Sequence, residues 1–494
     1  MSQGKKPKPN RPPNLKLKAA RKALPSPSGA PEMCMSRREL AEAANAYVWS
    51  RTRGEQHTNM TEHDIGRYER GEVHWPERWR RYGLRGALGV SSDNELGFYP
   101  NRKSAISTGG ASSRLFEPAK SSSGISDSSA AKGFEFPARL EDAIQVTTNL
   151  WRADVEGRND LRNAEFVASA FITPALRAIA SGEEHPGSGG DWEVHEPDVE
   201  TVRRITIAFR ELDNRYGGGQ IRERSLRFLD AEVAPLLKGR FNEQVGRSLV
   251  SAVAELTALT GWAAYDTGLH GLGQRYLVQA LRMAVAAADR PLSAEVLAAM
   301  SHQCIYLGES AEALDLARAA GKIAREVDIP ALVAEAAVLE AHGHAVANDE
   351  RSCTASLTRA EAALDKADRS RDPAWIGYFD EAYLSAKFGH CFTALGRGDL
   401  AERFAYRSLE MDGTYVRGRQ FNLALYATAL VDQDNPRVDQ AAAVGIEAAL
   451  LAEGLRSARS IDYLARLADR LAPYCGVREV DDFNDCARPL LHSN

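Results

Sequence analysis

Apolar residues in the first hundred positions recur at the three- and four-residue spacing of amphipathic helices. They do so between Asn14 and Leu24, and the sequence PSPSG then ends the segment. A second helix is expected to begin at Ser36, because Glu39 follows at the three-residue spacing of a capping box. Together with two further segments, the pattern predicts a bundle of short helices over residues 14–100.

Those two further segments carry their own start and stop signals. Thr61 is expected to cap a third helix, and Gly71 supplies its stop. Pro76 suits the first turn of a fourth helix, which is expected to end at Gly89. Residues 1–13 have no apolar period and are expected to form a disordered basic arm.

Nearly every segment beyond Phe134 predicts a helix. Residues 104–133 are rich in Ser, Gly and Ala, so 101–135 is expected to be a flexible linker. A helical connecting region is expected over 136–254. Because alternating β-branched residues are scarce, no sizeable sheet is expected, and the predicted fold class is all-α.

From residue 255 to residue 494, small and large apolar residues alternate in paired helices. Aligning Leu277, Leu314, Leu357 and Phe404 gives offsets of 37, 43 and 47 residues. A helical hairpin cannot bury both of its faces alone, so stacked neighbours must supply the core. The pattern therefore predicts an α-solenoid.

This solenoid resembles tetratricopeptide repeats, whose own period is about 34 residues. The nearest match to that repeat is Trp262, Tyr265 and Gly268, followed by Ala280. The resemblance implies a concave inner face that binds a peptide or protein effector, or a surface that mediates dimerisation.

Charge is divided unevenly along the chain. Residues 1–103 hold 20 Lys and Arg against 11 Asp and Glu, while the rest holds 42 basic and 56 acidic residues. Such asymmetry favours an N-terminal module that binds a polyanion and an acidic body that would repel one. A basic segment with no ligand is the plainer alternative.

The remaining composition points to a soluble protein without enzymatic machinery. No stretch reaches the roughly 18 uncharged apolar residues of a membrane helix, and no signal peptide is expected. Walker, zinc-protease and nucleophile-elbow motifs are missing, so neither a cofactor nor an enzyme is expected. Six cysteines without a C-x-x-C pair favour buried thiols in a reducing, cytoplasmic setting.

Residues 14–90 resemble the Cro/cI-like (XRE) helix-turn-helix family, over about the first fifth of the chain. More narrowly, the arrangement looks like actinomycete regulators that carry a helix-turn-helix ahead of a tetratricopeptide-like body. The resemblance depends on the strings Asn14-x-x-Leu17-x-x-x-Arg21, Ser36-Arg-Arg-Glu-Leu40-Ala41, Thr61-Glu-His-Asp-Ile65-Gly-Arg-Tyr-Glu69-Arg70-Gly71 and Leu88-Gly89-Val90.

By this resemblance the base-reading positions are Glu62, His63 and Arg67. Such a helix enters the major groove, where Arg67 would pair with guanine, Glu62 would accept from cytosine and His63 would donate. The plainer alternatives are that Glu62 only complements the helix dipole and that Arg67 is merely solvated.

The family's phosphate-contacting positions fall on Ser36, Arg37 and Arg70, and Thr61 at the start of the reading helix completes the predicted DNA-binding set. The chain departs from the family in one respect, because residues 50–59 lengthen the turn between the second and third helices. This polar segment is expected to form a loop. Glu69 is expected to hold the module together rather than to touch DNA.

The sequence thus predicts a nucleoid-associated regulator of transcription. Its expected partners are double-stranded DNA, a second copy of the chain in a homodimer and an effector on the repeats, with no membrane. The alternative is a tetratricopeptide-like scaffold whose N-terminal module binds protein rather than DNA. Salt dependence separates the two, since phosphate contacts release counterions.

Overall fold

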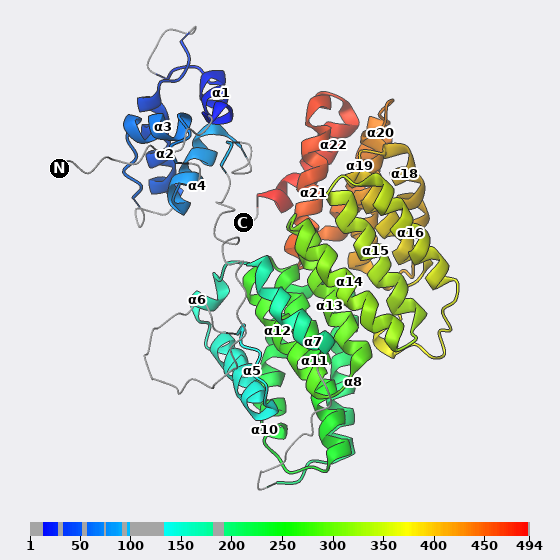
Figure 1. Cartoon of the computed structure of the whole chain (residues 1–494). Coiled ribbons are helices and arrows are strands. Elements are labelled where there is room, and N and C mark those ends of the chain that lie inside the picture. The colour runs from blue at the N-terminus through cyan, green and yellow to red at the C-terminus, as the bar shows by residue number, and fades with distance from the viewer. Residues whose placement is uncertain are drawn as a thin grey trace, which may run out of the picture. The chain divides into compact units, whose positions relative to one another are not determined.

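The computed structural model describes residues 13–27, 33–51, 57–73, 76–90, 96–98, 133–180 and 192–492. Within these ranges every regular element is a helix, and the only extended pairings are two isolated bridges, Pro25–Cys34 and Glu193–Arg240. The predicted all-α class is therefore confirmed. The chain divides into two compact units, residues 1–123 and 124–494, called here the module and the body (Figure 1).

Four helices form the described part of the module: α1 (Leu15–Ala23), α2 (Arg37–Arg51), α3 (Glu62–Glu69) and α4 (Arg78–Leu88). Their ends follow local signals. Asn14 caps α1 by accepting from the Leu17 amide, and Gly89 ends α4 in the left-handed region at φ 67°. The expected arm, except Pro13, and the expected linker up to residue 132 lie outside the described residues.

The module has its own small core between these helices. Leu40 and Ile65 are completely buried, and Tyr68 is 2% exposed, so all three belong to this core. Trp79 is half-buried and its ring meets the Tyr82 ring edge-on, with 5.6 Å between the ring centres, a common packing of aromatic pairs. The other core members include Leu17, Met35, Ala41, Ala44, Met60, Leu84 and Leu88.

Six helical hairpins make up most of the body. They are α11 (Glu243–Asp266) with α12 (His270–Ala286), α13 (Arg290–Tyr306) with α14 (Ser310–Glu326), α15 (Pro330–Val346) with α16 (Glu350–Leu364), α17 (Glu381–Ala394) with α18 (Gly398–Arg407), α19 (Val416–Val431) with α20 (Val438–Ala452), and α21 (Ala458–Leu471) with α22 (Arg478–Leu491). The four residues aligned in the sequence fall on α12, α14, α16 and α18, the second helix of successive hairpins. The solenoid-like architecture is confirmed.

Further helices precede the hairpins: α5 (Leu140–Val155), α6 (Asn159–Arg162), α7 (Ile172–Ala180), α8 (Glu196–Tyr216), α9 (Gly218–Phe228) and α10 (Ala234–Leu236). The boundary expected between residues 254 and 255 falls inside α11. Helices α8 and α9 pack on α11 as well, so the stack of helices begins earlier than the repeat pattern indicates.

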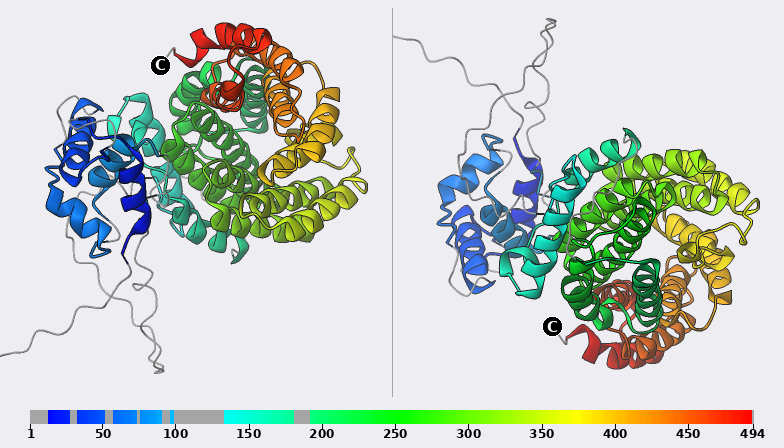
Figure 2. Two further views of the ribbon diagram at one scale, coloured as in Figure 1. Left: turned by 90° about the horizontal axis from the view of Figure 1, so that it is seen from above. Right: turned by 90° about the horizontal axis from the view of Figure 1, so that it is seen from below.

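The body curls until its last helices meet its first ones (Figure 2). Gly217 turns the chain between α8 and α9 at φ 84°. Two residues later, the Gly219 amide donates to the carbonyl of Arg456 at 2.8 Å. Arg417 of α19 also reaches Asp213 of α8, at 2.6 Å. These contacts join segments about two hundred residues apart and close the curl. Gly217 thus forms the turn, and Gly218 and Gly219 begin α9.

Among the described residues, none of the helices combines the length and the apolar character needed to span a membrane.

Candidate functional site

Helix α3, the predicted reading helix, is positioned first by its own N-terminus. The Thr61 hydroxyl accepts from the Asp64 amide, and the Asp64 carboxylate accepts from the Thr61 amide at 3.1 Å, which completes a capping box. Burial alone would raise the pKa of Asp64, but the Thr61 hydrogen bonds and the nearby Arg80 outweigh it and lower the pKa. The Thr61 side chain is therefore used in the cap.

The lengthened turn before α3 is tied back to α2. Asn45 of α2 donates to the Met60 carbonyl at 2.8 Å and accepts from the Met60 amide at 2.9 Å. The Thr58 hydroxyl also donates to the Asn45 side chain. One amide side chain thus fixes the residues that lead into α3 and holds the helix against α2. Residues 52–56 of the predicted loop lie outside the described part.

A buried carboxylate joins three of the module's helices. Glu69 at the end of α3 accepts from the guanidinium groups of Arg21 of α1 at 2.8 Å and Arg37 of α2 at 2.7 Å. Burial by itself raises the pKa of Glu69, but the hydrogen bonds and charges of the two arginines outweigh it and lower the pKa. This arrangement agrees with the structural role predicted for Glu69.

Helix α4 is also fastened to α3. The Arg80 guanidinium lies 3.2 Å from Asp64 and donates to the Tyr68 hydroxyl at 3.0 Å. Both acceptors belong to α3, so α3 is held by ion pairs to α1, α2 and α4. A helix fixed on three sides presents its remaining side chains in a defined direction.

The predicted base-reading residues lie on the outside of α3. Glu62 and His63 are exposed, and the Arg67 side chain is 43% exposed. His63 and Arg67 are one turn apart and share a face, whereas Glu62 lies at the N-terminus of the helix. Arg67 is 3.5 Å from Glu72 just after the helix, so its cation has an acidic neighbour within the module.

The predicted phosphate-contacting residues lie beside the same helix, and each already has a partner within the module. An ideal Cβ on Gly66 would lie 3.0 Å from a nitrogen of Arg70 and 3.8 Å from one of Arg37, so glycine lets both guanidinium groups lie over α3. Arg70 pairs with Glu72 at 2.8 Å. Ser36 caps α2, because its hydroxyl accepts from the Glu39 amide at 3.2 Å.

The body contains a second group of titratable side chains, on the first helix of three successive hairpins. Glu295 and His302 lie two turns apart on α13, and Glu335 and His342 repeat that spacing on α15, forty residues later. The next such helix, α17, places Tyr383, Lys387 and His390 in the corresponding stretch. These seven residues are called the inner wall. Helix α21 lies inside the curl next to them, with Tyr463 5.6 Å from the His390 ring (Figure 2).

Two carboxyl groups of the inner wall share one hydroxyl. Tyr378 lies 2.6 Å from one Glu335 oxygen and 3.0 Å from one Glu295 oxygen, and each carboxyl keeps a second oxygen without a hydrogen-bond partner in the described part of the chain. Burial, and then the charge of Glu295, raises the pKa of Glu335 well above its ordinary value. One proton shared by the pair relieves the repulsion between the two carboxylates.

Burial favours the neutral forms of the histidines and the lysine of the inner wall. Burial, and next the charge of Lys387, lowers the pKa of His342 to about 3. Burial, followed by the charge of Arg459, lowers the pKa of Lys387 itself to about 7. His302 and His390 also have pKa values well below the ordinary one, mainly because of burial. Perturbed groups gathered in this way are typical of binding or catalytic sites.

A buried charge cluster lies where the curl closes. Asp266 of α11 accepts from Arg459 at 3.0 Å, lies 3.3 Å from Arg417 and also accepts from the Ser457 hydroxyl and the Gly218 amide. Burial favours its neutral form, but these positive partners outweigh it and lower the pKa of Asp266. Arg459 lies 4.7 Å from the centre of the Tyr265 ring, a cation–π contact.

None of the inner-wall residues was predicted from the sequence, although the Glu and His pair repeated forty residues apart was a readable signal. Of the six cysteines, Cys304, Cys353 and Cys391 are buried thiols as expected, but Cys34 and Cys475 are exposed. In the described ranges no group of three or more His, Cys, Asp or Glu is arranged to hold a metal ion.

Comparison with models of known protein families gives no match, and comparison with curated protein sequences gives none either. The family resemblance of the module and of the repeats therefore remains a prediction, and the function of the chain is inferred from its own residues.

Proposed function

We propose that this chain is a sequence-specific DNA-binding regulator of transcription whose body binds a peptide or protein effector. The observation that carries the proposal is the outer face of α3. His63 and Arg67 share this face, Arg37 and Arg70 flank it, and the opposite side of the helix is fixed within the module. An α-helix fits the major groove, and flanking arginines suit the phosphates on either side.

Binding of DNA is tested with the full chain and labelled genomic fragments in an electrophoretic shift assay. A retarded species at low salt is expected, and its affinity should fall steeply as the salt concentration rises, because several phosphate contacts release counterions. If no fragment is retarded at low salt, DNA binding is refuted. If binding to a partner protein is found instead, with little salt dependence, the scaffold function is favoured.

The assignment of the reading residue is tested by Arg67→Ala. This variant should lose about 1–3 kcal/mol of discrimination at one base position while it keeps its other preferences. The control is Arg227→Ala on α9 of the body, which removes a more exposed cation whose ion-pair partner is Glu223. An Arg67→Ala variant with the sequence preference of the parent protein would contradict the assignment.

The inner wall is the proposed effector site in the body. The second carboxyl oxygens of Glu295 and Glu335, and the Nδ1 of His342, have no donor or acceptor partner outside that carboxyl pair among the described residues, and they would suit the N–H and C=O groups of a peptide. An asparagine amide could also bind a peptide backbone, but two asparagines of the body have local roles instead. Asn348, with φ 59°, lies in a turn, and Asn422 donates to the Ser408 carbonyl at 3.0 Å.

We further propose that the regulator acts as a homodimer, since helix-turn-helix proteins commonly bind two half-sites one DNA turn apart. Sedimentation of the full chain tests this, with a mass of twice 53.9 kDa expected. A monomer that remains a monomer on DNA would remove this part of the proposal.

A further inference from the structure

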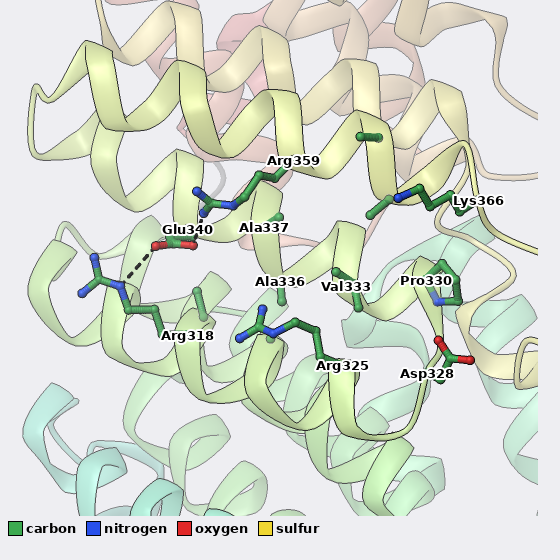
Figure 3. Close-up of a pocket in the computed structure, with 14 residues that line it drawn as sticks. Arg318, Arg325, Asp328, Pro330, Val333, Ala336, Ala337, Glu340, Arg359 and Lys366 are labelled. Carbon is green, nitrogen blue, oxygen red and sulfur yellow. Dashed lines mark hydrogen bonds and ion pairs between the residues drawn. The ribbon is translucent and has the colours of Figure 1, made fainter.

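A groove runs along the outside of the body, away from the residues of the inner wall. It lies between α14 and α16, with α15 as its floor, and has a volume of about 690 Å³ (Figure 3). Small residues from all three helices line the groove and leave it open: Ala317, Gly321, Ala336, Ala337, Ala362 and Ala363. Volumes of this size are typical of ligand-binding clefts.

More cations than carboxylates line the groove. Arg318 and Arg359 both pair with Glu340, at 3.1 and 2.5 Å, so one carboxylate serves two arginines. Arg325 and Lys366 extend over the groove in Figure 3, and among the described residues neither has a carboxylate within ion-pair distance. The other acidic lining residue is Asp328. Four cations therefore face two carboxylates, on a body that is acidic as a whole.

The solenoid itself indicates what such a groove accepts. One hairpin earlier, the corresponding interval between α12 and α14 is covered by α7 of the same chain, which packs on both helices (Figure 1). Helix α7 buries small side chains there, Pro174, Ala175 and Ala178, and leaves Leu176 62% exposed on its outer side. Arg290 donates to the Ala178 carbonyl at 2.9 Å. A short helix whose fully buried residues are small, with Ile179 partly buried near its end, thus fills this kind of interval.

We propose that the open groove between α14 and α16 binds a short acidic helix of a partner protein. The face of that helix toward α15 carries mainly Ala, Gly or Ser, as the buried residues of α7 are Pro174, Ala175 and Ala178. Its flanks carry Asp or Glu, which meet Arg325 and Lys366. Helices laid in grooves are a common mode of recognition, and the unmatched cations select the charge of the partner. This surface is separate from the proposed DNA and effector sites.

The test uses two synthetic helical peptides of about 12 residues with the same alanine face, one flanked by Glu and the other by Lys. Binding to the full chain is measured by fluorescence anisotropy. The Glu peptide should bind at least about tenfold more tightly than the Lys peptide, a difference of about 1.4 kcal/mol. Equal affinity of the two peptides, or no binding of the Glu peptide at 1 mM, would overturn the proposal.

Variants then locate the binding surface. Ala362→Trp fills the groove from an exposed position, and Arg325→Glu with Lys366→Glu reverses the unmatched charges. Each should weaken binding of the Glu peptide by about tenfold. Ala355→Trp and Arg351→Glu, at exposed α16 positions outside the groove, are the matched controls and should bind the peptide as the parent protein does. If the controls weaken binding as much as the groove variants, the peptide binds elsewhere.

Discussion

The module and the body place their charges in opposite ways. In the module the cations predicted to meet DNA, such as Arg67 and Arg70, lie at the surface beside a single carboxylate, Glu72. In the body the groups with strongly shifted pKa values, such as Lys387 and Glu335, are about 95% buried. Interactions of exposed charges are screened by salt, whereas burial shifts the pKa values of titratable groups and so makes stability depend on pH. The comparison therefore predicts a salt-sensitive module and a pH-sensitive body.

The largest effect is expected from Asp266→Ala in the body. The change leaves Arg459 and Arg417 buried next to each other without their shared carboxylate, which should cost about 3–5 kcal/mol of unfolding free energy. The measurement is denaturant unfolding of the full chain followed by circular dichroism. Asp160→Ala, which removes an exposed partner of Arg158, is the control and should change little. Equal stability of the two variants would show that the buried cluster does not hold the curl closed.

A smaller effect is expected from Glu69→Ala in the module. The change should cost about 2–3 kcal/mol, because Arg21 loses its buried partner while Arg37 can turn to solvent. DNA binding should weaken together with the module's unfolding transition. The control is Glu42→Ala, whose carboxylate pairs with Arg38 on the surface. Loss of DNA binding in the control alone would mean that Glu69 does not present α3.

Lys387→Met tests the pH dependence of the body. The pKa of Lys387 is lowered from the ordinary 10.5 to about 7, so between these values the unfolded chain binds the extra proton. Stability should therefore rise with pH above 7, by up to about 1.4 kcal/mol per pH unit from this group. Unfolding at pH 7, 8 and 9 should show the rise in the parent protein and in Lys366→Met, but not in Lys387→Met. If the unfolding free energy of the parent protein does not change between pH 7 and pH 9, the predicted contrast with the module is wrong.

The smallest effect is expected from Arg70→Ala. A lost phosphate contact weakens binding to all sequences alike and lowers the slope of log affinity against log salt by about one. Titrations at several salt concentrations measure this slope. If the variant instead changes sequence preference, Arg70 is a reading residue and the roles of Arg67 and Arg70 must be exchanged.

The helices of the module could be predicted because their signals are local. Thr61, Gly71 and Gly89 act within a few residues of the ends that they set, so the sequence alone places α3 and α4 to within a residue or two. The hydroxyls of two predicted DNA contacts, Ser36 and Thr61, also accept hydrogen bonds in helix caps. The capping-box spacing already indicated that competing role.

The charge cluster could not be predicted in the same way. Arg417 and Asp213 are 204 residues apart, and only the accumulated turn of the hairpins brings them together. The repeat period fixes the order of the helices but not the curvature that closes the curl. The groove between α14 and α16 likewise depends on the spacing of helices that no local pattern reports.

The closed curl has a consequence for how the body comes apart. An open stack of repeats loosens from its two ends, because each terminal unit has only one neighbour. Here the last hairpin is also a neighbour of α8 and α11 through Arg456 and Arg459, so neither end is free to fray alone. Amide protons in α21 should therefore exchange as slowly as those in α13. The body should melt in one cooperative step, as a ring does, and release anything enclosed by it at the same moment.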